Sequence, residues 1–96
     1  MIMDALGILR EYEHVITERF GVRKVGVFGS FAKGEERIDS DIDILVEFKE
    51  GQKTFGNYME LKFYLEELFG RKVDLVIETA IKPRLREQIL KEAVYA

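Results

Sequence analysis

Three aspartates, Asp41, Asp43 and Asp74, have the side-chain type and the spacing to bind divalent metal ions. Asp43 is the second residue of the apolar segment IDILVEF and Asp41 directly precedes that segment, so in a strand their carboxylates share one face at about 6.5 to 7 Å. Asp74 lies in a second such segment, KVDLVIE, and all three converge if the segments form neighbouring strands. Carboxylates this close repel one another unless a cation lies between them. Oxygen ligands alone favour Mg²⁺ or Mn²⁺, which also coordinate substrate phosphates.

A candidate phosphate-binding turn precedes these aspartates. Gly29 follows the segment RKVGVF and lets a ligand approach the backbone, while Ser30 offers a hydroxyl and an amide at the start of a short helical segment. Lys33 and Arg37 can add positive charge. A Gly-Ser pair after a strand is most often an ordinary turn, so the pair alone does not establish a phosphate site.

A calcium loop is the main alternative for the same aspartates. Asp39, Asp41, Asp43 and Glu50 occupy the first, third, fifth and twelfth positions of an EF-hand loop. The sixth position requires glycine for its sharp turn, and Ile44 stands there instead. The β-branched residues around it favour a strand, so we disfavour calcium binding and interpret Asp39 as a turn residue.

The hydrophobic pattern predicts one α/β (α+β) domain over residues 1–96, with seven elements in the order αβαβαβα. Helices are expected at residues 4–20, 30–34, 54–69 and 83–94, and strands at residues 23–28, 42–48 and 72–78. The tight link between the first two strands predicts antiparallel pairing, and the crossover helix after the second predicts parallel pairing, which gives a three-stranded mixed sheet. Strand alternation then places the aspartates on the face that the helices leave uncovered. In the last helix, Leu85, Ile89 and Ala93 are expected to face inward.

Composition excludes several other kinds of site. The 96 residues include no cysteine and one histidine, His14, which rules out disulfides, thiolate zinc sites, a Cys nucleophile and a histidine-rich metal centre. The net charge of -3 disfavours unselective binding to nucleic acid. No apolar run approaches the roughly 20 residues needed to cross a bilayer, and the first residues do not resemble a signal peptide. We therefore expect no membrane association and a cytoplasmic location.

The stretch GSFAKGEERIDSDIDILV joins the Gly-Ser pair at positions 29 and 30 to Asp41 and Asp43 across ten intervening residues, and Asp74 follows on a later strand. In this combination, and in size and element order, the chain resembles the minimal nucleotidyltransferases (MNT) of the DNA polymerase beta superfamily over nearly its whole length. The resemblance implies a polymerase beta palm-like fold in which the Gly-Ser turn binds nucleotide phosphates and the three aspartates bind metal ions. Lys33 stands where the family pattern has arginine, which keeps the charge but loses the bidentate geometry.

The resemblance also implies a biological setting and a reaction. Many MNT proteins are antitoxins paired with a HEPN-domain ribonuclease toxin, and members transfer AMP from ATP to a tyrosine of that toxin. By this resemblance, one Mg²⁺ held by all three aspartates activates an acceptor hydroxyl, which attacks the α-phosphate in line. A second ion held by Asp41 and Asp43 neutralises the departing pyrophosphate, and Asp74 can take the hydroxyl proton.

Two alternatives remain open. The protein can be a binding module that masks a toxin without catalysis, or a nucleotidyltransferase that acts on a small hydroxylated molecule. Because a chain of this length leaves little room for a separate acceptor-binding domain, we expect a protein acceptor. Met59 and Phe63, which lie off the packing stripe of their helix, and the last helix are candidate contact surfaces.

Overall fold

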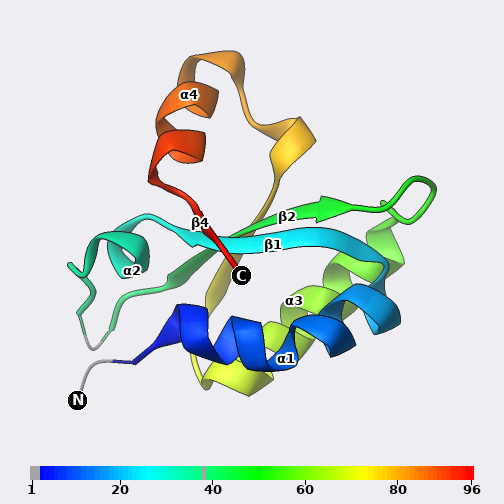
Figure 1. The fold of residues 1–96 in the computed structure, drawn as a ribbon, viewed down its shortest axis with the longest axis horizontal. Coiled ribbons are helices and arrows are strands. Elements are labelled where there is room, and N and C mark those ends of the chain that lie inside the picture. Colours follow the sequence, from blue (N-terminus) through cyan, green and yellow to red (C-terminus); the bar gives the residue numbers. More distant parts are fainter. Residues whose placement is uncertain (1–2, 38) are drawn as a thin grey trace.

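The computed structural model describes residues 3–37 and 39–96, which form a four-stranded mixed sheet with helices on both faces (Figure 1). The elements follow one another as α1 (Ala5–Phe20), β1 (Val22–Phe28), α2 (Ser30–Lys33), β2 (Ile42–Phe48), α3 (Phe55–Phe69), β3 (Val73–Ile77), the 3-10 turn η1 (Glu78–Ala80), α4 (Pro83–Glu92) and β4 (Val94–Tyr95). Every predicted element is present, with ends shifted by at most two residues. None of the helices in the described ranges is long and apolar enough to cross a membrane.

Capping residues set the bounds of the two long helices. The side chains of Asp4 and Thr54 accept hydrogen bonds from amides in the first turns of α1 and α3, at 2.9 Å and 3.1 Å. Both helices end at a glycine in the left-handed conformation, Gly21 and Gly70. Pro83 occupies the first helical position of α4, where its missing amide costs nothing.

The strands are ordered β3-β2-β1-β4 in the sheet. β1 and β2 are antiparallel, with Phe28 opposite Asp43. β2 and β3 are parallel, with Asp43 opposite Asp74. Both predicted pairings are therefore confirmed, and the register brings the starts of β2 and β3 to the end of β1.

The predicted three-stranded sheet is wrong, because Val94 and Tyr95 leave the last helix and form β4, antiparallel to β1. Gly26 makes this pairing possible, since a side chain there would come within 2.7 Å of the Val94 carbonyl oxygen and within 3.1 Å of the Tyr95 ring. The helix expected to run to residue 94 ends at Glu92 for the same reason.

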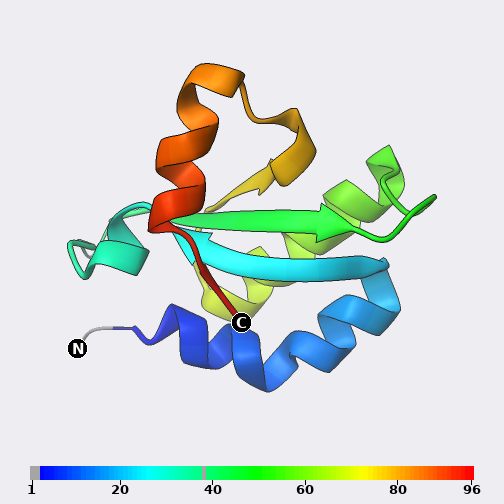
Figure 2. The same cartoon turned by 45° about the horizontal axis from the view of Figure 1, so that its top comes forward.

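Each face of the sheet carries its own hydrophobic cluster. α1 and α3 pack on one face through buried residues that include Ile16 and Leu65. On the other face, Leu45 and Ile81 form a smaller cluster beneath α4. Figure 2 shows α4 on one side of the sheet and α1 with α3 on the other.

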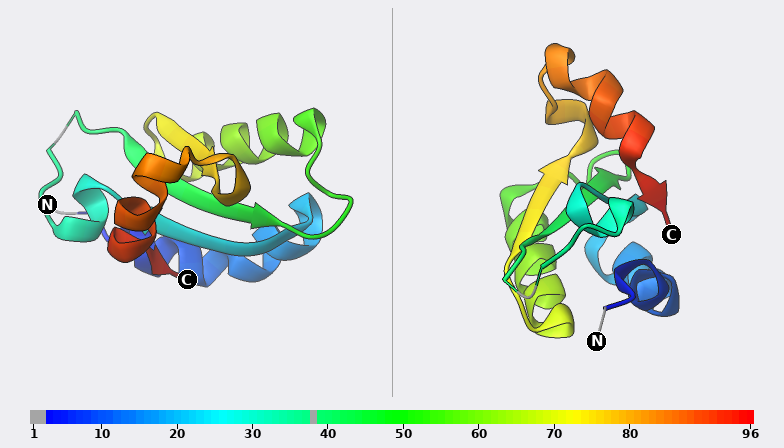
Figure 3. Two further views of the ribbon diagram at one scale, coloured as in Figure 1. Left: turned by 90° about the horizontal axis from the view of Figure 1, so that it is seen from above. Right: turned by 90° about the vertical axis from the view of Figure 1, so that its left-hand side faces the viewer.

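The expectation of an uncovered second face is therefore wrong in part. Ile89 and Leu90 of α4, and Ala93 directly after it, pack over this face, whereas Leu85, predicted to face inward, is 46% exposed. α4 begins away from the sheet and approaches it with its C-terminal half (Figure 3), so its first turn stays in solvent. The part of this face that carries the predicted aspartates lies beyond the cluster, at the starts of β2 and β3.

Candidate active site

The sheet register brings the predicted aspartates to one place. Asp43 and Asp74 are direct neighbours across the β2–β3 pair, and Asp41 lies just before β2, close enough to Asp43 for its charge to act on that carboxyl. Asp41 and Asp74 are exposed, whereas Asp43 is half-buried. Ile44 is fully buried within β2, so the EF-hand alternative is excluded.

The charge state of Asp43 reflects this crowding. Burial is the main cause that raises its pKa from 3.8 to about 6, followed by the negative charges of Asp74 and Asp41. The ionised site therefore carries a repulsion that a bound cation would relieve.

The predicted turn lies directly against Asp43. Gly29 follows β1 with φ of 71° and ψ of -147°, a region that is essentially restricted to glycine. A side chain at Gly29 would overlap the Asp43 carboxylate, because the register places the end of β1 beside this residue. Ser30 begins α2 and is half-buried, and the Gly29 carbonyl accepts hydrogen bonds from the amides of Ala32 and Lys33 at 3.1 Å each. The backbone of the turn is thus held at the edge of the carboxylate group.

The two cations expected beside the turn have other partners. Lys33 Nζ lies 2.9 Å from Glu92 Oε1, so the side chain is tied to the last residue of α4. The hydrogen bond and the charge of Glu92 raise the pKa of Lys33. Arg37 is exposed, and its backbone amide and carbonyl form hydrogen bonds with Ser40 and Arg71. Lys33 can reach a phosphate only if it exchanges Glu92 for that ligand.

The three aspartates suit a divalent ion, because carboxylate oxygens are the ligands that Mg²⁺ prefers and because a cation would offset the repulsion between Asp43 and its two acidic neighbours. They are not gathered around one point. Across residues 3–37 and 39–96, no three His, Cys, Asp or Glu side chains lie close enough together to hold a single ion. For all three aspartates to bind the same metal, their carboxylates must therefore come closer together.

Sequence reasoning missed two structural parts of this site. The C-terminal segment reaches it, since β4 pairs with Val27 near the Gly-Ser turn and Glu92 holds Lys33. Arg71, in the connection from α3 to β3, contacts the turn that precedes Asp41. Gly26 was a usable sign of the close approach of β4, whereas no spacing rule points to Arg71.

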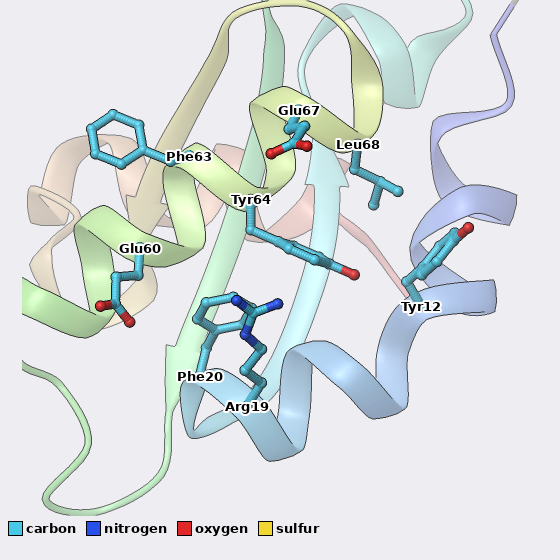
Figure 4. A pocket seen from close by; sticks show the side chains of 8 residues that line it. All are labelled: Tyr12, Arg19, Phe20, Glu60, Phe63, Tyr64, Glu67 and Leu68. Atoms are coloured by element: carbon cyan, nitrogen blue, oxygen red, sulfur yellow. The ribbon is translucent and has the colours of Figure 1, made fainter.

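A hollow of about 830 Å³ lies between α1 and α3, on the sheet face opposite the aspartates (Figure 4). Arg19 lies over the rings of Phe20 and Tyr64, with its guanidinium carbon 5.2 Å and 5.6 Å from their centroids. Phe63, predicted to be a contact residue, lines the rim and is 59% exposed, while Met59 is half-buried. None of the residues predicted to bind metal or nucleotide lines this hollow.

Known proteins are similar to this chain in sequence and in fold. The profile of the nucleotidyltransferase domain family matches residues 9–96. Protein adenylyltransferase MntA of Thermococcus cleftensis is 46% identical over 88 residues, which cover 92% of this chain and 88% of that protein. A solved structure provisionally described as a minimal nucleotidyltransferase is 47% identical, with a TM-score of 0.77 and 93% of each chain covered.

A more distant structure shares the fold. It comes from the complex of a tri-AMPylated Shewanella oneidensis HEPN toxin with its MNT antitoxin, and the match is 20% identical with a TM-score of 0.66, covering 97% of this chain and 71% of that one. The resemblance noted in the sequence is confirmed by the family profile and by the close relatives. This chain belongs to the nucleotidyltransferase domain family.

Proposed function

We propose that this protein transfers AMP from ATP to a hydroxyl group of a partner protein, with Mg²⁺ bound at Asp41, Asp43 and Asp74. One observation carries the proposal: the backbone of the Gly29 turn lies against the Asp43 carboxylate, and Asp74 is the strand neighbour of Asp43. A phosphate bound at the turn would therefore lie beside the carboxylates.

Each residue has a distinct role in the proposed reaction. Mg²⁺, when bound, supplies positive charge that activates the hydroxyl and neutralises the leaving group. The Gly29–Ser30 turn orients the phosphate chain, and the missing side chain of Gly29 lets the Asp43 carboxylate lie against this turn. Asp74 accepts the proton of the acceptor hydroxyl. The hydroxyl oxygen then forms a bond to the α-phosphorus, and the bond to pyrophosphate breaks.

The acceptor that we propose is a tyrosine of a HEPN toxin, and the protein acts as its antitoxin. Support comes from the relatives: one is named a protein adenylyltransferase, and a structure of the same fold contains an antitoxin with an AMPylated HEPN toxin. The exposed positions of Asp41 and Asp74 agree with access by a macromolecular acceptor.

Transfer is tested by incubating the protein with Mg²⁺, ATP and a HEPN-domain toxin from the same organism, and then measuring the intact mass of both chains. We expect the HEPN chain to gain one or more AMP groups and a HEPN Tyr→Phe variant to gain none. An Asp41→Asn, Asp43→Asn double variant should lose the reaction, whereas Asp39→Asn, in the exposed turn beside the site, should keep it. A stable complex without added mass would favour the binding-module alternative. Transfer to a small hydroxylated molecule instead of the HEPN chain would favour the other.

A further inference from the structure

Arg37 and Ser40, in the turn just before Asp41, are joined by two hydrogen bonds. The Arg37 amide donates a hydrogen bond to Ser40 Oγ at 2.7 Å, and the Ser40 amide donates one back to the Arg37 carbonyl at 3.1 Å. The Ser40 carbonyl belongs to the peptide bond that begins Asp41. Whatever holds this turn therefore also sets the backbone position of Asp41.

Arg71 holds the turn from outside. Its Nη1 atom donates to the Ser40 carbonyl at 3.2 Å and to the Arg37 carbonyl at 3.4 Å. The same guanidinium lies over the ring of Phe31 in α2, at 5.1 Å from the ring centroid. Arg71 itself lies three residues before Asp74 and is half-buried. One side chain thus contacts both the turn before Asp41 and the helix after the Gly-Ser pair, and its backbone leads directly into the third strand.

We propose that Arg71 is a positioning residue that fixes the backbone before Asp41 relative to Asp74 and to the phosphate turn. The inference rests on the proposed function, because it assigns Asp41 as a metal ligand. Asp43 needs no such support, since it is paired within the sheet to both neighbouring strands. Asp41 lies outside β2, so its position depends on the turn.

The contacts distinguish positioning from a simple charge effect. Nη1 of Arg71 binds backbone carbonyls, and among the ion pairs of the described residues none involves Arg71. A positive charge near a metal site disfavours the metal, so if charge alone mattered, removing Arg71 would tighten metal binding. If Arg71 positions Asp41, its removal weakens binding. Lysine keeps the charge but lacks the planar fork that stacks on Phe31, so Arg71→Lys should also weaken binding.

The test is a titration of the full chain with Mn²⁺, in which binding is measured by calorimetry or by the electron paramagnetic resonance signal of the free ion. We expect Arg71→Ala and Arg71→Lys to raise the Kd for Mn²⁺ by about three- to tenfold. Lys72→Ala, which removes an exposed neighbouring charge without touching the turn, should change the Kd by less than about twofold. In an Asp41→Asn background, Arg71→Ala should add no further loss, because the residue acts through Asp41.

Amide hydrogen exchange supplies an independent readout. Exchange of the residues 39–42 should be faster in both Arg71 variants than in Lys72→Ala, while β1 stays protected. Unchanged or tighter Mn²⁺ binding in the Arg71 variants, or a full additional loss in the Asp41→Asn background, would overturn the inference. If Arg71→Ala does not fold, Arg71→Lys decides the matter. Failure of the unmodified chain to bind Mn²⁺ would instead contradict the proposed function, and the exchange data would still show whether Arg71 holds the turn before Asp41.

Discussion

Replacing Asp43 by asparagine should stabilise the metal-free protein near neutral pH. The carboxyl is half-buried beside two other aspartates, and burial together with their charges raises its pKa from 3.8 to about 6. For a fully shielded group this rise corresponds to about 3 kcal/mol. Because Asp43 is partly solvated, screening reduces the expected gain in the free energy of unfolding to about 1 to 2 kcal/mol.

The sign follows from proton binding. The folded-state pKa lies above the unfolded value, so the folded protein binds more protons between about pH 4 and pH 6. The contribution of Asp43 to stability is therefore fully present below the unfolded pKa and is lost as the pH rises through about 6. The Asp43→Asn variant has no such loss, and its advantage over the unmodified chain should be larger at about pH 7.5 than at about pH 5.

Urea unfolding in the presence of a chelator measures this difference at both pH values. Asp39→Asn is the matched control, because Asp39 is exposed in the neighbouring turn. Added Mg²⁺ should stabilise the unmodified chain, by about 2.7 kcal/mol at a hundred times the Kd, and should stabilise Asp43→Asn less. The reasoning is refuted if Asp43→Asn is destabilised at about pH 7.5, or if its effect is the same at both pH values.

Three further changes test other parts of the structure. Gly29→Ala should lower kcat/KM for AMP transfer by at least about tenfold, because the backbone conformation of Gly29 excludes a side chain and the Asp43 carboxylate lies where that side chain would be. The control Gly51→Ala, also at a positive φ of 79° but in open space, should leave kcat/KM unchanged. Glu92→Gln should release Lys33 and lower the Kd for ATP by about two- to fivefold. This gain in ATP affinity should disappear when Lys33→Met is added, and the control Glu87→Gln should not show it. Gly26→Val should displace β4 and lower the free energy of unfolding by about 1 to 3 kcal/mol in urea, and an unchanged urea midpoint would mean that the close approach of β4 does not matter.

The predicted secondary structure was accurate where local signals are strong. The caps Asp4 and Thr54 and the glycines Gly21 and Gly70 fix the helix bounds through contacts within a few residues, so the sequence alone was enough. The β2–β3 pairing followed from the length of the crossover helix, and that pairing brought Asp43 and Asp74 together.

The errors concern contacts between distant segments. A two-residue strand such as Val94–Tyr95 has no periodicity to detect, and its pairing depends on the geometry around Gly26. The exposure of Leu85 depends on the angle at which α4 leaves η1, which helical spacing does not specify. No local pattern indicated the contact of Lys33 with Glu92, because it arises only when α4 returns to the site.

Direct location of the metal and the nucleotide tests the central claim most sharply. Crystals grown with Mn²⁺ and a non-hydrolysable ATP analogue would show the ion by its anomalous scattering. The account predicts Mn²⁺ among the carboxylates of Asp41, Asp43 and Asp74, with the phosphate chain against the Gly29–Ser30 turn. Mn²⁺ bound elsewhere, or a nucleotide seated in the hollow between α1 and α3, would contradict it.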